Sequence, residues 1–229
     1  MLSRAVRSTV VLSISSAMMA GCAGSRSGGS DIDGTVTIEE AVVHEVNLAR
    51  TNPRLYAKFT RQWRQYYDGN LRKAPGHNPV RTIEGVAALD EAILYLESVD
   101  PVQPLIWSEG MSEGARDHVD NTGPAGDIGH SGSNGSAVGE RVNRYGRWQH
   151  RVGENISYGG NDAREFVMRL IIDDGIADRG HRTNIFAPDF RYVGVAFGYH
   201  ATYKTMCVMT LATEYVEAGN LIPQAYPDH

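Results

Sequence analysis

The chain has 229 residues, a formal charge of −5 and a hydrophobic content of 41%. This length allows one large domain, or one domain with a small additional element, and the composition is ordinary for a soluble globular protein. The acidic balance argues against nonspecific nucleic-acid binding, which needs a basic surface. Two cysteines are too few for a disulfide-stapled scaffold. No apolar run reaches the roughly 18 residues needed to span a bilayer.

The first 21 residues have the pattern of an export signal. Two arginines, Arg4 and Arg7, precede an apolar stretch over residues 9–20 that is too short for a stable transmembrane helix. The following Met19-Ala20-Gly21-Cys22 resembles a bacterial lipobox, so we expect residues 1–21 to be removed and Cys22 to be lipidated. Cleavage would change the formal charge from −5 to −7, because two positive charges and no negative ones are lost. The alternative is an ordinary secretory signal cut near Ala20.

Residues 22–36 are rich in Gly and Ser, which is typical of a flexible tether. With a lipid at Cys22, this segment would attach the protein to the cell envelope and hold the folded domain off the membrane surface. Ala23 follows the cysteine, so in a two-membrane bacterium we expect sorting to the outer membrane. Without the lipid, the protein would simply be secreted.

Helical patterns dominate the first part of the folded chain. Thr37 and Glu40 have the spacing of a capping box and predict a helix to about Thr51, ended by Asn52-Pro53. Residues 54–82 mix aromatics with arginines, and at this overall charge we interpret them as a wrapping helix and loop rather than a base-stacking surface. Further helices are expected over residues 84–96 and 109–121, before a Gly-rich loop over about 122–139.

The last part of the chain combines one helix with two strands. Residues 163–173 have apolar side chains at helical spacing, and residues 192–198 and 202–215 are rich in Val, Tyr, Phe and Thr. A short turn at residues 200–201 predicts a hairpin between the strands. Helices first and strands last favour an α+β layered domain.

Five residues are candidates for a functional site. His130 and His181 lie in Gly-flanked loops, which bring side chains close to ligands. Glu154 follows a glycine in an unusually tight context, and Asp173 and Asp174 end the predicted helix, where at least one carboxylate should face inward and need a partner. Two histidines and two carboxylates together would suit a divalent metal such as zinc. Spacing alone leaves separate structural roles open.

The remaining reactive residues favour structural roles. We expect His44 and His118 to lie on helices, and the other four histidines to lie in loops or at the terminus without acidic neighbours; these are His77, His150, His200 and His229. The Gly110–Gly114 segment matches the G-x-S-x-G pattern of hydrolase nucleophiles, but it falls inside a predicted helix rather than after a strand. Cys207 alternates within an apolar strand and should be buried and unpaired. No phosphate loop or dinucleotide fingerprint is present, so no nucleotide cofactor is expected.

Motifs spread along residues 39–216 resemble the CAP superfamily, also called the SCP domain, which includes cysteine-rich secretory proteins, antigen 5 and plant pathogenesis-related proteins. The matching segments occur in family order: Glu45–Arg50, Leu105–Ser108 with Ala115–His118, Gly129–Ser131, Gly153–Ile156, Gly180–Ile185, Gly194–Phe197 and Met206–Val208. Any one of these segments is weakly specific. Together and in order they identify the chain as resembling a bacterial lipoprotein member of this superfamily.

The resemblance implies a three-layer α-β-α sandwich over residues 37–217, followed by a tail over 218–229. It also implies that His130, Glu154 and His181 line one cleft with a second carboxylate, either Asp173 or Asp174. Residues 54–104 depart from small bacterial members as an inserted helical segment, which should cover one side of the sandwich and narrow the cleft.

The same resemblance suggests a function. We expect an exported, envelope-anchored protein whose His/acid cleft binds zinc or another divalent metal through His130 and His181, and a lipid or other small ligand nearby. One alternative is a metal-dependent hydrolase of the peptidase kind, with Glu154 positioning a water. Another is a protein-interaction module with a non-catalytic tetrad. The resemblance favours a binding protein over an enzyme.

Overall fold

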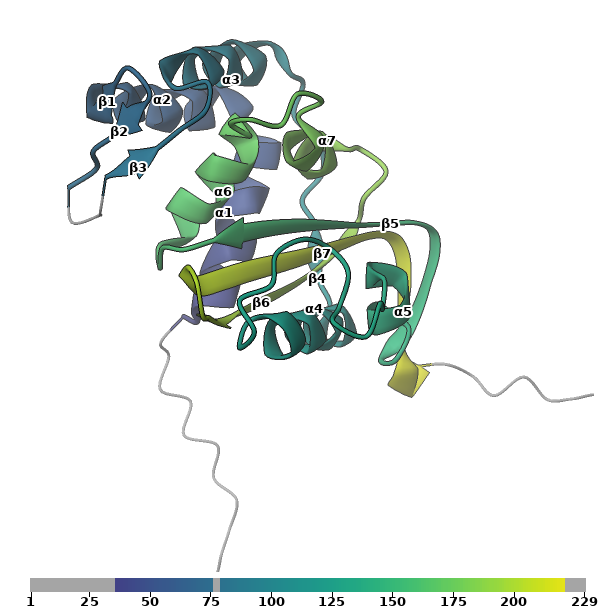
Figure 1. Ribbon diagram of the computed structural model, residues 1–229. Helices are drawn as coiled ribbons and strands as arrows, with labels where there is room; N and C mark the ends of the chain where they lie inside the picture. The colour runs from purple at the N-terminus through teal and green to yellow at the C-terminus, as the bar shows by residue number, and fades with distance from the viewer. Residues whose placement is uncertain (1–35, 76–78, 221–229) are drawn as a thin grey trace, which may run out of the picture. The chain divides into compact units, whose positions relative to one another are not determined.

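A four-stranded sheet forms the middle layer of the domain (Figure 1). The computed structural model describes residues 36–75 and 79–220. In spatial order, the strands are β4 (Ile106–Trp107), β6 (Tyr192–His200), β7 (Lys204–Glu217) and β5 (Gly146–Tyr158). β4 runs parallel to β6, and the other neighbours are antiparallel.

Helices cover both faces of this sheet. α1 (Ile38–Thr51) and α6 (Ala163–Ile172) pack on one face, and α4 (Glu109–Thr122) and α5 (Val138–Val142) on the other (Figure 1). The expected α+β fold, a three-layer α-β-α sandwich, is therefore confirmed. The Thr37 capping box at the start of α1 is also present.

The inserted segment builds a further layer outside α1 and α6. It comprises α2 (Pro53–Trp63), a 3₁₀ turn (Arg64–Tyr66), the small strands β1 (Tyr67–Asp68), β2 (Leu71–Arg72) and β3 (Val80–Arg81), and α3 (Val86–Ser98). α2 packs on α1 and α3, and α3 reaches α6. Asn52-Pro53 ends α1 as expected, but Pro53 also starts α2, because proline fits the first turn of a helix.

The expected order of helices first and strands last is wrong, because β5 lies between α5 and α6 and pairs with β7 along its length. Two features of β5 explain why this strand was not predicted. A bulge between Gln149 and Val152 breaks the alternation, and its buried residues form one continuous run rather than every second position. The short helices α5 and α7 (Gly180–Phe186) were also not predicted. The expected hairpin of β6 and β7 is confirmed, with its turn at residues 201–203.

Arg50, the last residue of the family-like segment Glu45–Arg50, has a structural role. Its fully buried guanidinium donates to the carbonyls of Gln103, Ile185, Ala187 and Phe190. Burial lowers the pKa of Arg50 to about 10, which still leaves it charged at neutral pH. Asn47 exchanges two hydrogen bonds with the backbone of Leu105. These residues therefore fasten α1 to two distant connecting segments.

No helix within residues 36–75 and 79–220 has the length and apolarity of a membrane span. The predicted export signal over residues 1–21, the lipidation site Cys22, His77 and His229 lie outside the described residues.

Candidate functional site

The first half of the candidate site joins a loop to the central sheet. His130 lies in the connection between α4 and α5, and Glu154 lies on β5. Nδ1 of His130 is 3.0 Å from Oε1 of Glu154, and Nη2 of Arg141 is 2.5 Å from Oε2. The His130 side chain is 56% exposed, whereas the Glu154 and Arg141 side chains are almost fully buried. A buried ion pair therefore presents one carboxylate oxygen to a solvent-accessible imidazole.

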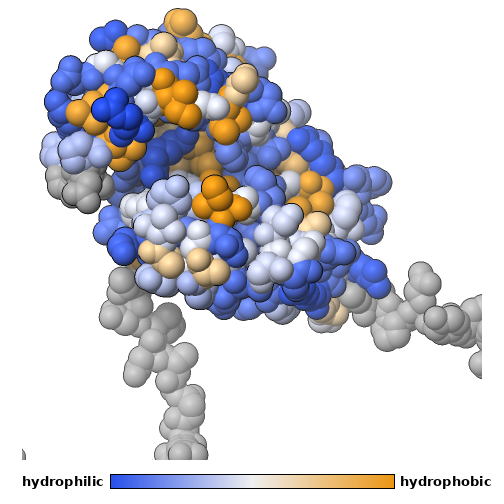
Figure 2. All heavy atoms as spheres, in the orientation of Figure 1, coloured by the Kyte–Doolittle hydropathy of each residue, from blue (hydrophilic) through white to orange (hydrophobic). Residues whose placement is uncertain are grey.

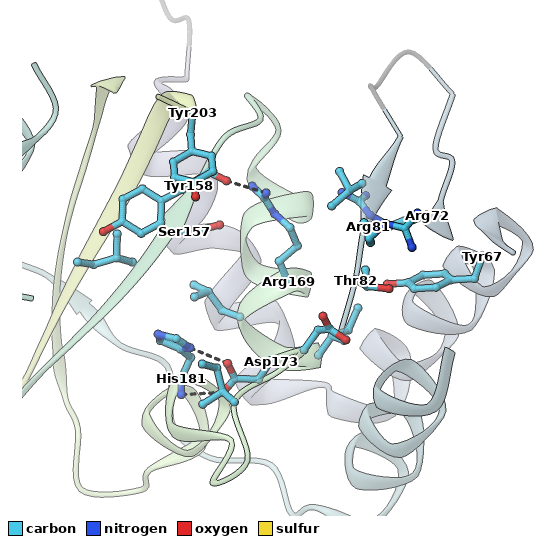
Figure 3. A pocket seen from close by; sticks show the side chains of 16 residues that line it. Tyr67, Arg72, Arg81, Thr82, Ser157, Tyr158, Arg169, Asp173, His181 and Tyr203 are labelled. Atoms are coloured by element: carbon cyan, nitrogen blue, oxygen red, sulfur yellow. Dashed lines mark hydrogen bonds and ion pairs between the residues drawn. The ribbon is translucent and has the colours of Figure 1, made fainter. Parts of the chain in front are cut away.

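The second half is built at the junction of α6 and α7. Asp173 follows α6 in the left-handed conformation, with φ of 56°, which turns its side chain toward the start of α7. Oδ1 of Asp173 lies 2.6 Å from Nδ1 of His181, and Oδ2 accepts the backbone N–H of His181 at 2.9 Å (Figure 3). The carboxylate thus fixes both the backbone and the ring of His181.

The two halves face each other across one cavity of about 410 Å³. The ring centroids of His130 and His181 are 6.4 Å apart. A carboxylate can only accept, so Nδ1 of each neutral ring carries the proton, and Nε2 keeps its lone pair. We refer to His130, Glu154, Asp173 and His181 as the His/acid cleft.

Asp174 does not join this cleft. Its carboxylate accepts the backbone N–H groups of Ile83, Glu84 and Gly85, at 2.6, 2.8 and 3.1 Å, and so contacts the inserted segment. Between the two aspartates that the sequence left open, the structure therefore places Asp173 beside His181. The expectation that one carboxylate faces inward holds for Asp173, which is 3% exposed.

Supporting residues that sequence reasoning missed hold the loop of His130. Arg141 donates to the carbonyls of His130 and Ser136 as well as to Glu154. Buried His118 lies 2.9 Å from the carbonyl of Gly129, and burial lowers its pKa. No local pattern identifies Arg141, because its partners are 5 to 13 residues away and only folding brings them together.

Another group of charges supports α7. Arg179 donates to both oxygens of Glu84, which lowers the pKa of that carboxyl to about 2. Buried Arg182 donates to Glu91 on α3. The inserted segment therefore braces the helix that carries His181, while Asn155, next to Glu154, donates to the carbonyl of His181.

The glycine before Glu154 has a packing reason. A side-chain carbon at Gly153 would lie 3.0 Å from the ring of Phe190, which is tighter than ordinary contact. Glycine at this position lets β5 pass close to Phe190 and keeps Glu154 in place.

Other sequence expectations have definite outcomes. Ser112 is buried within α4, and its hydroxyl donates to Ser108, so the G-x-S-x-G match is not a nucleophile elbow. Cys207 is buried and free, and burial raises its pKa to about 12.

The remaining histidines of the described residues lie outside the His/acid cleft. His44 is exposed on α1. His150 was expected in a loop without acidic neighbours; it lies in β5, 3.7 Å from Glu214. His200 was also expected in a loop, but it ends β6 and is buried.

The donor set limits what the cleft can bind. Among residues 36–75 and 79–220, no three His, Cys, Asp or Glu side chains lie together as a ready metal site. Both carboxylates are committed to the histidines and to other donors, so the available metal ligands are the Nε2 atoms of His130 and His181. Carboxylates that orient metal-binding imidazoles in this way are a common second layer of metal sites.

One family model matches more than half of the chain. The model of the cysteine-rich secretory protein (CAP) family matches residues 76–211. A comparison with curated proteins found no match.

Distant similarities exist among solved structures. One is an outer surface protein of Borrelia burgdorferi, with 14% identity and a TM-score of 0.42, covering 56% of this chain and 89% of that one. A second is an extracellular SCP-domain protein of Bacillus anthracis, with 16% identity and a TM-score of 0.39, covering 66% of this chain and 43% of that one. A third is a cysteine-rich secretory protein of Staphylococcus aureus, with 10% identity and a TM-score of 0.35, covering 62% and 44%. The chain thus spans less than half of the latter two proteins.

Proposed function

The chain belongs to the cysteine-rich secretory protein (CAP) family, and from this premise we propose that it is an exported binding protein whose His/acid cleft holds a divalent metal and a small ligand. The supporting observation is that two partly exposed imidazoles, 6.4 Å apart, are each oriented by a buried carboxylate. Nothing else in the described residues combines these features.

His130 and His181 would hold the metal through Nε2. Two protein nitrogens leave coordination positions for water or a ligand oxygen, so affinity should be modest, and zinc is one of the metals that imidazole ligands suit. When bound, the metal supplies a Lewis-acidic position for an oxygen of the ligand. Glu154 and Asp173 keep the rings in the tautomer that can bind it.

The engagement of Glu154 favours a binding role over hydrolysis. A general base needs a carboxylate lone pair within reach of the water it activates. Here Oε1 faces His130, and Oε2 accepts a charge-assisted hydrogen bond from buried Arg141. A Glu154→Gln variant discriminates the two roles. If Glu154 is the base, the peptidase activity of the purified protein should vanish in this variant. If Glu154 only orients His130, the variant should bind the metal more weakly, and no peptidase activity should be found in the wild type either.

Anchoring to the envelope is the second part of the proposal, and it rests on the lipobox-like Met19-Ala20-Gly21-Cys22. Metabolic labelling with a fatty-acid analogue should tag the wild type and leave Cys22→Ser untagged. Equal labelling of both would contradict lipidation and leave plain secretion.

The binding role itself is tested on protein purified from its own cell envelope. Metal analysis and native mass spectrometry should find a divalent metal at up to one per chain and an additional mass for a small ligand, lipids included. Protein that carries neither, and that takes up neither when both are supplied, would contradict the proposal and favour the protein-interaction alternative.

A further inference from the structure

A second cavity lies beside the His/acid cleft, between the inserted segment and the sandwich. It has a volume of about 340 Å³ and is lined from one side by β2, β3 and Thr82, and from the other by α6 and the end of β5. Figure 2 shows this face of the molecule hollowed between these parts, and Figure 3 shows Arg169 extending from α6 toward Tyr158 with the insertion opposite. The two cavities share Ile176 and His181 in their linings.

Two arginines and one glutamate form a charged cluster at this cavity. Arg72 and Arg169 both line it, and both flank Glu165, whose Oε1 is 2.7 Å from Nη2 of Arg72 and 4.0 Å from Nε of Arg169. All three side chains are largely buried. Burial lowers the pKa of Arg169, the charge of Glu165 raises it, and the charge of Arg72 lowers it. One carboxylate therefore faces two guanidinium groups in this cluster.

Two further carboxylates, Asp173 and Asp174, line the cavity, so with Glu165 three carboxylates match the three arginines Arg72, Arg81 and Arg169. Asp173 is committed to His181, and Asp174 accepts three backbone N–H groups of the inserted segment. Arg81, exposed in the lining, has no ion pair within the described part of the chain. Arg81 is therefore open to an incoming anion, whereas both aspartates are already engaged.

Two buried donors of this cluster lack acceptors. Nη1 of Arg72 and Nε of Arg169 have no hydrogen-bond partner among residues 36–75 and 79–220. Buried N–H groups are normally paired, and those of a charged group are costly to leave unpaired. An oxyanion in the cavity would supply the acceptors once these two side chains turn toward it.

The rest of the lining is apolar and aromatic. Ile156 and Leu170 are buried behind it, and the rings of Tyr158 and Tyr203 contact each other at a tilt of 42°, with centroids 5.5 Å apart, at its edge. Such walls suit the uncharged body of a ligand, and a few polar groups suffice to fix its orientation. The volume of the cavity admits one small molecule rather than a folded partner.

We propose that this arginine cavity, lined by Arg72, Arg81, Arg169, Tyr158, Tyr203 and Thr82, binds an organic anion, with its carboxylate or phosphate against the arginines and its apolar body on the tyrosines. The far end of such a ligand lies next to His181, so the cavity selects acidic compounds for the adjoining cleft. Binding of the acidic end needs no metal, so it can be tested independently of the proposed metal site.

The test is calorimetric titration of the metal-free protein with four probes: 3-phenylpropionate, phenyl phosphate, inorganic phosphate and the neutral 3-phenylpropanol. Both organic anions should bind about tenfold or more tightly than the alcohol, and the tighter of the two identifies the preferred head group. Inorganic phosphate, which lacks the apolar body, should bind more weakly than phenyl phosphate. Equal binding of the alcohol and the anions would overturn the proposal.

Three variants locate the binding. Arg169→Gln should remove the preference for anions, whereas Arg164→Gln, on the same helix but paired with Glu45 outside the cavity, should keep it. Thr82→Trp fills the cavity from the insertion without touching the buried arginines, so it remains informative if Arg169→Gln does not fold. Full anion binding by a folded Arg169→Gln or by Thr82→Trp would place the ligand elsewhere. Loss of zinc binding in His130→Ala/His181→Ala with anion binding retained would separate this cavity from the cleft.

Discussion

Asp173 and Asp174 are adjacent in the chain and bind opposite parts of the molecule. Asp173 accepts from the ring and backbone of His181, and Asp174 accepts three backbone N–H groups just before α3. The left-handed conformation of Asp173 sends the two side chains in different directions. Because of this, the inserted segment is fastened one residue away from the His/acid cleft.

Asp173→Asn should weaken zinc binding by roughly tenfold to a hundredfold, as is typical when the carboxylate partner of a metal-binding histidine is replaced. The amide can still accept a hydrogen bond, but it no longer favours the orientation and basicity of the His181 ring. Competition with a chromophoric chelator measures the change. An affinity equal to that of the wild type would show that Asp173 does not tune His181.

Asp174→Ala should loosen the inserted segment and leave zinc binding nearly unchanged. Asp174, which follows α6, accepts the backbone N–H groups of residues 83–85, just before α3. Loss of an exposed hydrogen bond of this kind costs about 1 kcal/mol, and amide exchange at residues 83–85 should accelerate by about fivefold to tenfold. Asp100→Ala, at an exposed aspartate, is the matched control. Unchanged exchange at these three amides would contradict the fastening role.

Arg141→Met should be strongly destabilising, by about 3–5 kcal/mol, because it leaves the Glu154 carboxylate buried without its cation. Urea unfolding measures the loss. The double variant Arg141→Met/Glu154→Gln should recover part of it, since the unpaired charge is then gone. Arg144→Met, which breaks an exposed pair with Asp117, should cost no more than about 1 kcal/mol. If the changes in the free energy of unfolding caused by Arg141→Met and by Glu154→Gln simply add in the double variant, the buried pair is not coupled.

His118 predicts a loss of stability in acid. Burial holds its pKa below the ordinary value of 6.5 in the folded protein. At a pH between the pKa of His118 in the folded protein and 6.5, the unfolded chain binds the proton and the folded chain does not. Stability therefore falls as the pH drops below about 6.5 and levels off below the folded pKa. His118→Gln should show a smaller difference in urea midpoint between neutral and mildly acidic buffer, whereas exposed His44→Gln should behave as wild type. If the His118→Gln variant loses as much stability in acid as the wild type, other groups cause the acid sensitivity.

Local sequence context was enough for some of the site and not for the rest. His130, Glu154 and His181 stand next to glycines that admit close approach, and family resemblance brought them together. The choice between Asp173 and Asp174 depends on one left-handed residue, which helical periodicity cannot predict.

Long-range contacts explain why Arg141 and β5 were not predicted. Arg141 acts through contacts formed only on folding, and β5 is buried in a continuous run with a bulge rather than in alternation. The helices were predictable because their apolar faces and caps are encoded locally, as at Thr37 and Ser108.

Zinc titration of the wild type and of His130→Ala/His181→Ala, at about pH 7.5 and about pH 5.5, tests the central claim most directly. The wild type should bind up to one zinc per chain at the higher pH and more weakly at the lower, because a protonated imidazole cannot coordinate a metal. The double variant should remain folded by circular dichroism, since neither histidine belongs to the apolar core, and should bind no zinc. Binding that survives in the double variant, or a wild type that binds none, would contradict a metal-binding His/acid cleft.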